Sequence, residues 1–337
     1  MKEASQHGKS PIDFKRDSSG SFTVGQEGDV AICTIVLNDR MLLVTANAVY
    51  ATHHSDHIDP DRTDINVPNV VPQIIIAYGG DTPFISRTLL TGCELFDQTY
   101  LGQQFDKERA LSLAFEAASN LAALTDIRKS IAEENDVVAK KLHGTSIGDS
   151  FELPATPNLR ARGEAFIRHA DITYQAAKGV SELFYPRKCA NENWADHIGE
   201  SLKSATTSNA QSERFLSATI RNINTARNFR NASEHPDQTK GVTFWDFELQ
   251  PGLTVTYPSI EIKHPETPLS RVDLLLFMND VINECICTFE GMSAFLCDEN
   301  IKLSGPFDCQ VVRRDEAKRG PNYTYRTTLK AGIRLPE

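Results

Sequence analysis

The chain has 337 residues, 40% hydrophobic and 24% charged, with a formal net charge of −10 at pH 7. This composition is typical of folded domains, and the length is sufficient for a sizeable core and for two domains. The negative net charge argues against a protein that coats nucleic acid without sequence preference, because such binding depends on neutralising phosphates.

Targeting and redox signals point to the cytoplasm. No apolar run is long enough to cross a bilayer, and the N-terminus lacks an apolar signal segment, so we expect a cytoplasmic protein that does not engage a membrane. The seven cysteines form no C-x-x-C pair, and several lie in apolar stretches. We interpret them as reduced core residues rather than as disulfides or zinc ligands.

The first third of the chain has the composition of strands. Residues 1–20 are polar and predict a flexible leader, and residues 21–105 predict a β-rich N-terminal domain. Asn38-Asp39 between two apolar runs suggests a hairpin, although residues 30–50 also fit a buried helix, because a short apolar run does not distinguish the two. The apolar runs of this part are 30–37, 41–44, 70–78 and 83–90.

From residue 106 the hydrophobic residues recur at helical spacing. Residues 106–300 therefore predict a helical domain, and opposing apolar faces make a bundle the economical packing. Thr267 before Pro268 has the order favoured at a helix start, so we expect the last helix to begin there. The other expected helices cover 106–141, 159–184 and 208–234.

Short strands interrupt and follow the helices. The runs 242–249 and 253–257 predict a hairpin about Gln250-Pro251-Gly252. The C-terminal extension, 301–337, contains two further predicted strands, 309–312 and 323–329. The expected fold class is α+β: a helical bundle preceded by a β-rich part, with a small β hairpin and a C-terminal β pair.

The most unusual stretch is Arg227 to Pro236, at the end of the third expected helix. Arg227 and Arg230 continue the apolar stripe of that helix, which would place both guanidinium groups toward the core, where each needs an anionic partner or a cleft. Asp171 is one candidate partner. Pro236 disfavours helical geometry at His235, so the histidine should lie at the helix end, near the negative pole of the helix dipole. Residues 201–240 carry a local excess of three positive charges, which suits a selective anion ligand.

Arg230-Asn231-Ala232-Ser233-Glu234-His235 resembles the R-x4-6-H signature of HEPN domains. The resemblance implies an all-helical, usually dimeric domain, and many HEPN members are metal-independent endoribonucleases that act as toxins or in defence. It therefore implies RNA as substrate, a homodimer, no cofactor and no metal, with an antitoxin or other protein as a further partner. The specific part of the resemblance is six residues. The sequence departs from one toxin subgroup, which has a tyrosine two positions after the histidine, because Pro236-Asp237 follows here.

The resemblance assigns roles that are chemically sensible for RNA cleavage. His235 would move a proton during attack of the ribose 2′-OH on the adjacent phosphate, and a dimer would supply a second histidine. Arg230 would stabilise charge on the phosphorane, while Asn231 would orient phosphate or water. The predicted binding residues are Arg227, for a flanking phosphate, and Asn228.

Two alternatives remain open at this stage. Other HEPN proteins are non-catalytic nucleotide-binding or interaction modules, in which the same arginines hold a phosphate or form an internal ion-pair network. An ion-pair network should bury Arg230 and His235 within one subunit, whereas a nuclease needs both side chains exposed at a cleft or dimer interface.

The second alternative is a zinc hydrolase that uses the loop His53-His54-Ser55-Asp56-His57. This loop resembles the H-x-H-x-D-H motif of metallo-β-lactamase-fold hydrolases, but it is one residue short, and its first two histidines are adjacent. A polar, solvated loop is the simpler interpretation of these residues.

Overall fold

The computed structural model describes residues 10–18, 22–25, 29–37, 40–143, 151–187, 193–205, 210–252, 254–301, 309–313 and 324–329. Within these residues the chain has an α+β fold in which long helices pack together and small sheets flank them. None of the helices in these ranges is both long and apolar enough to cross a membrane.

The N-terminal part is a four-stranded antiparallel sheet in the order β1-β2-β3-β4. Ile35, Leu42 and Ala51 are buried on the face that joins the main core, as the alternation of a half-buried strand requires. Residues 31–37 and 40–45 are thus strands and not a buried helix; the expected Asn38-Asp39 turn lies outside the described residues. The elements are α1 (Pro11–Asp17), β1 (Ala31–Leu37), β2 (Arg40–Thr45), β3 (Val49–His54), α2 (Ser55–Ile58) and β4 (Val70–Ile76).

The chain becomes helical earlier than the sequence predicts. The β-rich part was expected to reach residue 105, but its last strand ends at Ile76. The apolar run 83–90 is helical because Ile85 and Leu89, one turn apart, are fully buried against the long helices. The helical elements here are α3 (Pro83–Ile85), the π-helical turn η1 (Ser86–Leu90), α4 (Thr91–Leu95) and α5 (Gln98–Leu101).

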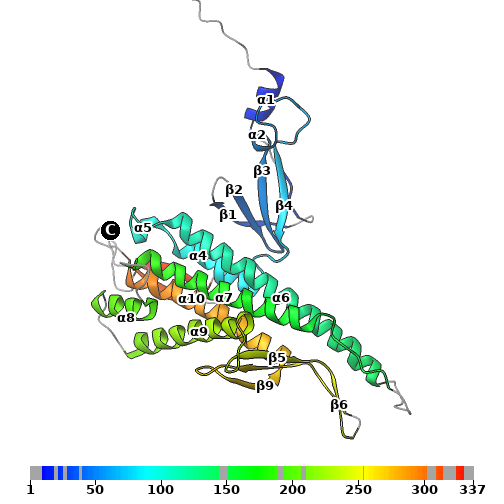
Figure 1. Ribbon diagram of the computed structural model, residues 1–337. Coiled ribbons are helices and arrows are strands. Elements are labelled where there is room, and N and C mark those ends of the chain that lie inside the picture. Colours follow the sequence, from blue (N-terminus) through cyan, green and yellow to red (C-terminus); the bar gives the residue numbers. More distant parts are fainter. Residues whose placement is uncertain are drawn as a thin grey trace, which may run out of the picture.

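Four long helices form the centre of the molecule, with the N-terminal sheet on one side and a three-stranded sheet beneath α9 on the other (Figure 1). The helices are α6 (Lys107–His143), α7 (Leu159–Phe184), α9 (Ala210–Glu234) and α10 (Leu274–Glu299). A shorter helix, α8 (Trp194–Ala205), lies between α7 and α9 in the chain and was not expected from the sequence.

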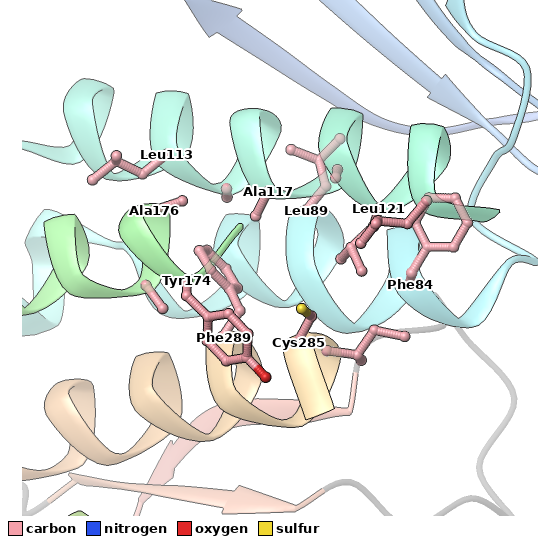
Figure 2. Close-up of a cluster of buried hydrophobic side chains, with 14 of the residues drawn as sticks. Phe84, Leu89, Leu113, Ala117, Leu121, Tyr174, Ala176, Cys285 and Phe289 are labelled. Carbon is pink, nitrogen blue, oxygen red and sulfur yellow. The ribbon is translucent and has the colours of Figure 1, made fainter. Parts of the chain in front are cut away.

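The core of this bundle depends on small side chains on α6. Ala110, Ala114, Ala117 and Ala118 are all fully buried, so neighbouring helices can approach α6 closely. Figure 2 shows side chains from η1, α6, α7 and α10 meeting at this core, among them Leu89, Leu121, Tyr174 and Phe289.

The sheets of the C-terminal half are small and antiparallel. The expected hairpin about residues 250–252 forms between β6 (Glu248–Gln250) and β7 (Thr254–Thr256). The strand β5 (Gly241–Trp245) does not join that hairpin but pairs with β8 (Ser259–Lys263), and β8 also pairs with β9 (Leu269–Asp273). The expected C-terminal pair is present as β10 (Cys309–Arg313) and β11 (Tyr325–Leu329).

The predicted start of the last helix was wrong. Leu269 and Val272 form strand β9, opposite Ile262 and Ile260 of β8, rather than the first turns of a helix. The helix α10 begins at Leu274, and the carboxylate of Asp273 accepts the N–H of Leu276 at 2.8 Å as its N-cap. Pairing with a neighbouring strand therefore outweighed the local helix-start signal at Thr267-Pro268.

Candidate functional site

Helix α9 presents the Arg230–His235 motif at its C-terminal end, alongside α7 (Figure 1). The N–H of His235 donates to the carbonyl of Asn231 at 2.9 Å, so one helical hydrogen bond continues past Glu234. Pro236 lacks an N–H and follows at once. The helix therefore ends at the histidine, as the sequence predicts.

The buried stripe of α9 contains Thr219, Ile223 and Ala226, and Arg230 continues it at the next helical step. Arg230 lies partly buried against α7, as predicted. Arg227 is not buried in this way. It lies one position away from the buried stripe, and the residue is exposed. The prediction that both arginines face the core is thus correct for Arg230 and wrong for Arg227.

Arg230 belongs to an internal ion-pair network. Its Nη1 donates to the Asp171 Oδ2 of α7 at 2.9 Å, and its Nε lies 3.4 Å from Glu234 Oε2. The Asp171 side chain is only 3% exposed, whereas that of Arg230 is 37% exposed. Glu234 is also 3.3 Å from Arg168 Nε. The positive charge of Arg230 is therefore matched by carboxylates of the same chain.

The two asparagines of the motif region differ in environment. Asn228 is buried, and its side-chain amide donates to Glu266 Oε2 at 3.2 Å. This bond connects α9 to the turn between β8 and β9. The predicted ligand contact of Asn228 stays a prediction. Asn231 is half-buried at the helix end.

His235 is exposed and lies just beyond the last residue of α9. It is eight residues from Arg227, which corresponds to about 12 Å along a helix axis at about 1.5 Å per residue. The structure therefore separates the predicted site into two places: the helix end with Arg230, Asn231 and His235, and the helix side with Arg227.

Arg227 borders a pocket of about 300 Å³ between α7, α9 and the start of α8. Two other cations, Lys178 and Arg187, line the same pocket, together with three side-chain amides and the ring of Trp194. Burial lowers the pKa of Lys178, and the nearby Arg187 and Arg227 lower it further, against the opposing effect of Glu182 and Asp171. The full lining is Gln175, Lys178, Arg187, Asn193, Trp194, Ala195, Ile223, Asn224 and Arg227.

The walls of this pocket are held in place by packing. Trp194 is buried, and its Nε1–H donates to Ser181 Oγ at 2.9 Å. The Lys178 ammonium lies 5.9 Å from the centre of the Trp194 ring, which is a cation–π distance. Gln175 and Lys178 follow Asp171 on α7 at helical spacing. The pocket therefore lies on the same polar face of α7 as the Arg230–Asp171 ion pair.

Sequence reasoning found Arg227 but missed Lys178, Arg187, Asn193 and Trp194. One signal was present: Asp171, Gln175, Lys178 and Glu182 recur on α7 at steps of four and three, which marks a polar stripe beside an apolar face. The unpredicted helix α8 supplies Trp194, so no local pattern could have placed the indole opposite Lys178.

The His53–His57 segment is not an open loop. His53 and His54 end strand β3, and His57 lies in α2. His53 Nε2 is 3.3 Å from Gln73 Oε1, and Asp56 pairs with Arg16 and Arg62. Among the described residues, no cluster of three or more His, Cys, Asp or Glu side chains is arranged to hold a metal ion.

Comparison of the chain with protein-family models, with curated proteins and with solved structures finds no match. The resemblance to HEPN domains therefore rests on the residues from Arg230 to His235 themselves. The fold is α+β, with the four long helices at its centre, and the two places with chemistry are the end of α9 and the pocket beside Arg227.

Proposed function

We propose that this protein is a non-catalytic binding module for a phosphate-bearing ligand such as a nucleotide, and that Arg227 holds the phosphate. The observation that carries the proposal is the pocket in which Lys178, Arg187 and Arg227 gather beside one another. Like charges placed this close repel each other, and an anion between them relieves that repulsion. Arg230, whose charge is matched by Asp171 and Glu234, has a structural role in this proposal.

Titration calorimetry with adenosine 5′-monophosphate tests the proposal on the full chain. We expect the nucleotide to bind and Arg227→Ala to weaken binding about 10- to 100-fold, the effect of losing one charge-assisted hydrogen bond of about 1.5–3 kcal/mol. Arg160→Ala is the matched control, because Arg160 lies on α7 outside the pocket, with its side chain 71% exposed. Equal binding by both variants and the wild type, or no binding at all, would contradict the proposal.

RNA cleavage is the second candidate, and the exposure of His235 favours it. An exposed imidazole and a partly exposed guanidinium at the same helix end are the groups that metal-independent cleavage needs. In this candidate His235 moves the proton, Arg230 and Asn231 contact the phosphate, and a homodimer supplies a second histidine.

Incubation of RNA with the wild type and with His235→Ala in the presence of EDTA tests this candidate. Cleavage that EDTA leaves unchanged and that His235→Ala abolishes would support it, because an exposed histidine can be replaced without loss of the fold. Light scattering on the same sample reports the expected dimer. Intact RNA with the wild-type protein would remove the candidate.

A further inference from the structure

The pocket beside Arg227 has more positive charge than its own carboxylates neutralise. Arg187 pairs with Glu182 across 3.0 Å. In the described part of the chain, no carboxylate lies within ion-pair distance of Lys178 or of Arg227. Two positive charges therefore face the pocket without an ion-pair partner in that part of the chain.

These two cations come from different helices that line the pocket. Lys178 belongs to α7 and Arg227 to α9, and these helices pack along each other. Lys178 is held against the ring of Trp194, itself fixed by its bond to Ser181, so the ammonium group is positioned by packing. A ligand group that enters the pocket can therefore contact an ammonium from α7 and a guanidinium from α9.

We infer that the pocket selects a phosphomonoester dianion over a phosphodiester monoanion, an inference that rests on the binding function proposed above. A phosphomonoester carries about −1.5 to −2 charges at pH 7 and presents three acceptor oxygens. A phosphodiester carries only one negative charge, so it neutralises only one of the two positive charges of Lys178 and Arg227, although its two free oxygens could contact both groups. The ligand class is thus a terminal phosphate, either on a nucleotide or as free inorganic phosphate, and not an internal phosphate of a nucleic-acid strand.

Adenosine 5′-monophosphate and adenosine 3′,5′-cyclic monophosphate form a matched pair of probes, because they share the nucleoside and differ in one ester bond. At pH 7.5 we expect the monoester to bind the full-length protein at least about tenfold more tightly, equivalent to about 1.4 kcal/mol. This preference should shrink at pH 5, because the second ionisation of a phosphomonoester has a pKa of about 6. Inorganic phosphate is the third probe: affinity equal to that of the nucleotide identifies free phosphate as sufficient, and weaker affinity identifies a nucleoside contribution.

Two variants separate charge from folding. Lys178→Met removes one positive charge and keeps a side chain of similar length. The ratio of monoester affinity to diester affinity should therefore fall toward one. Arg227→Lys keeps the charge and should keep the preference.

If both nucleotides bind the wild type equally and Arg227→Ala removes the binding of both, the pocket binds phosphate without this selectivity, and the inference of selectivity fails alone. If neither nucleotide binds, the proposed function fails, and the inference fails with it.

Discussion

Arg227 and Arg230 are three residues apart on one helix, yet they have different partners. Arg230 neutralises Asp171, a carboxylate that is almost fully buried and would be costly to leave unpaired. Arg227 is exposed at a pocket rim and pairs with no carboxylate in the described residues. At the scale of single residues, stability and ligand binding are therefore assigned to different members of the motif.

Replacement of Arg230 should destabilise the protein, whereas replacement of Arg227 should not. Arg230→Ala leaves Asp171 buried without its cation, and we expect a loss of about 3 kcal/mol. This is the lower end of the range of about 3–5 kcal/mol for broken buried pairs, because the guanidinium is 37% exposed. Arg227→Ala should change the free energy of unfolding by less than about 0.5 kcal/mol. Urea denaturation of both variants measures the difference.

A double variant tests the cause of that loss. Arg230→Met combined with Asp171→Leu removes both charges together, and it should recover much of the stability that Arg230→Ala loses. A double variant as unstable as Arg230→Ala would show that packing, rather than the unpaired carboxylate, accounts for the effect.

At the scale of elements, close contacts between helices and strands hold the site together. Gly163 of α7 faces Phe244 of β5, and a Cβ at this position would lie 2.2 Å from the Phe244 ring. The three-stranded sheet can therefore approach α7 only because this position has no side chain. The capping of α10 is a second element-scale feature, since Asp273 both ends β9 and begins the helix.

Gly163→Ala should lower the free energy of unfolding by about 1–3 kcal/mol, because the aromatic ring has to move out of a packed site. Gly199→Ala is the matched control: it lies in helix α8, and nothing lies within 4 Å of its added Cβ. It should be neutral or stabilise by up to about 1 kcal/mol through helix propensity. Thermal denaturation should show a lower melting temperature for Gly163→Ala and an unchanged or higher one for Gly199→Ala.

Asp273→Ala should cost about 1 kcal/mol, since the N–H of Leu276 loses its cap. Thr267→Ala, at the position where the sequence places the start of this helix, should cost only a few tenths of a kcal/mol. Chemical denaturation of both variants checks the assignment. A larger loss at Thr267 than at Asp273 would argue that the helix begins at Pro268.

At the scale of the whole molecule, charged side chains join α1 to α2 and to the residue that follows α2, after the end of strand β3. The Arg16 side chain is fully buried between Asp56, at 3.2 Å, and Asp59, at 2.9 Å. Asp59 also accepts the backbone N–H groups of Asp64 and Thr63. These two bonds, with a smaller effect of Arg16, lower the pKa of Asp59 from 3.8 to about 2.

This attachment should weaken in acid. Because the pKa of Asp59 is lower in the folded protein than its ordinary value, its stabilising effect is complete above about pH 4 and is lost as the pH falls toward 2. Hydrogen exchange at the Thr63 and Asp64 amides should therefore be faster in Asp59→Asn than in the wild type at neutral pH. The two proteins should converge near pH 2. Asp61→Asn, an exposed carboxylate in the same turn, is the control and should match the wild type throughout.

Local features were predictable from the sequence because they depend on nearby residues. The bounds of α7, the end of α9 before Pro236 and the β6–β7 turn all follow from hydrophobic period, proline chemistry and turn residues. The prediction that Arg230 faces the core follows from the same period. The sequence offered Asp171, 59 positions away, as one candidate partner of the arginines, and the tertiary structure shows that the pair forms with Arg230.

The tertiary structure decided everything that depends on distant partners. Residues 83–90 are helical because they pack on α6, and residues 269–273 form a strand because β8 lies beside them. The pocket combines Lys178, Trp194 and Arg227 from three helices, and no spacing within any one helix brings them together. By itself the sequence determined that a cationic motif ends a helix. Packing determined which cation is matched by an internal carboxylate and which faces a pocket, because pairing energies depend on distance in space and not on separation along the chain.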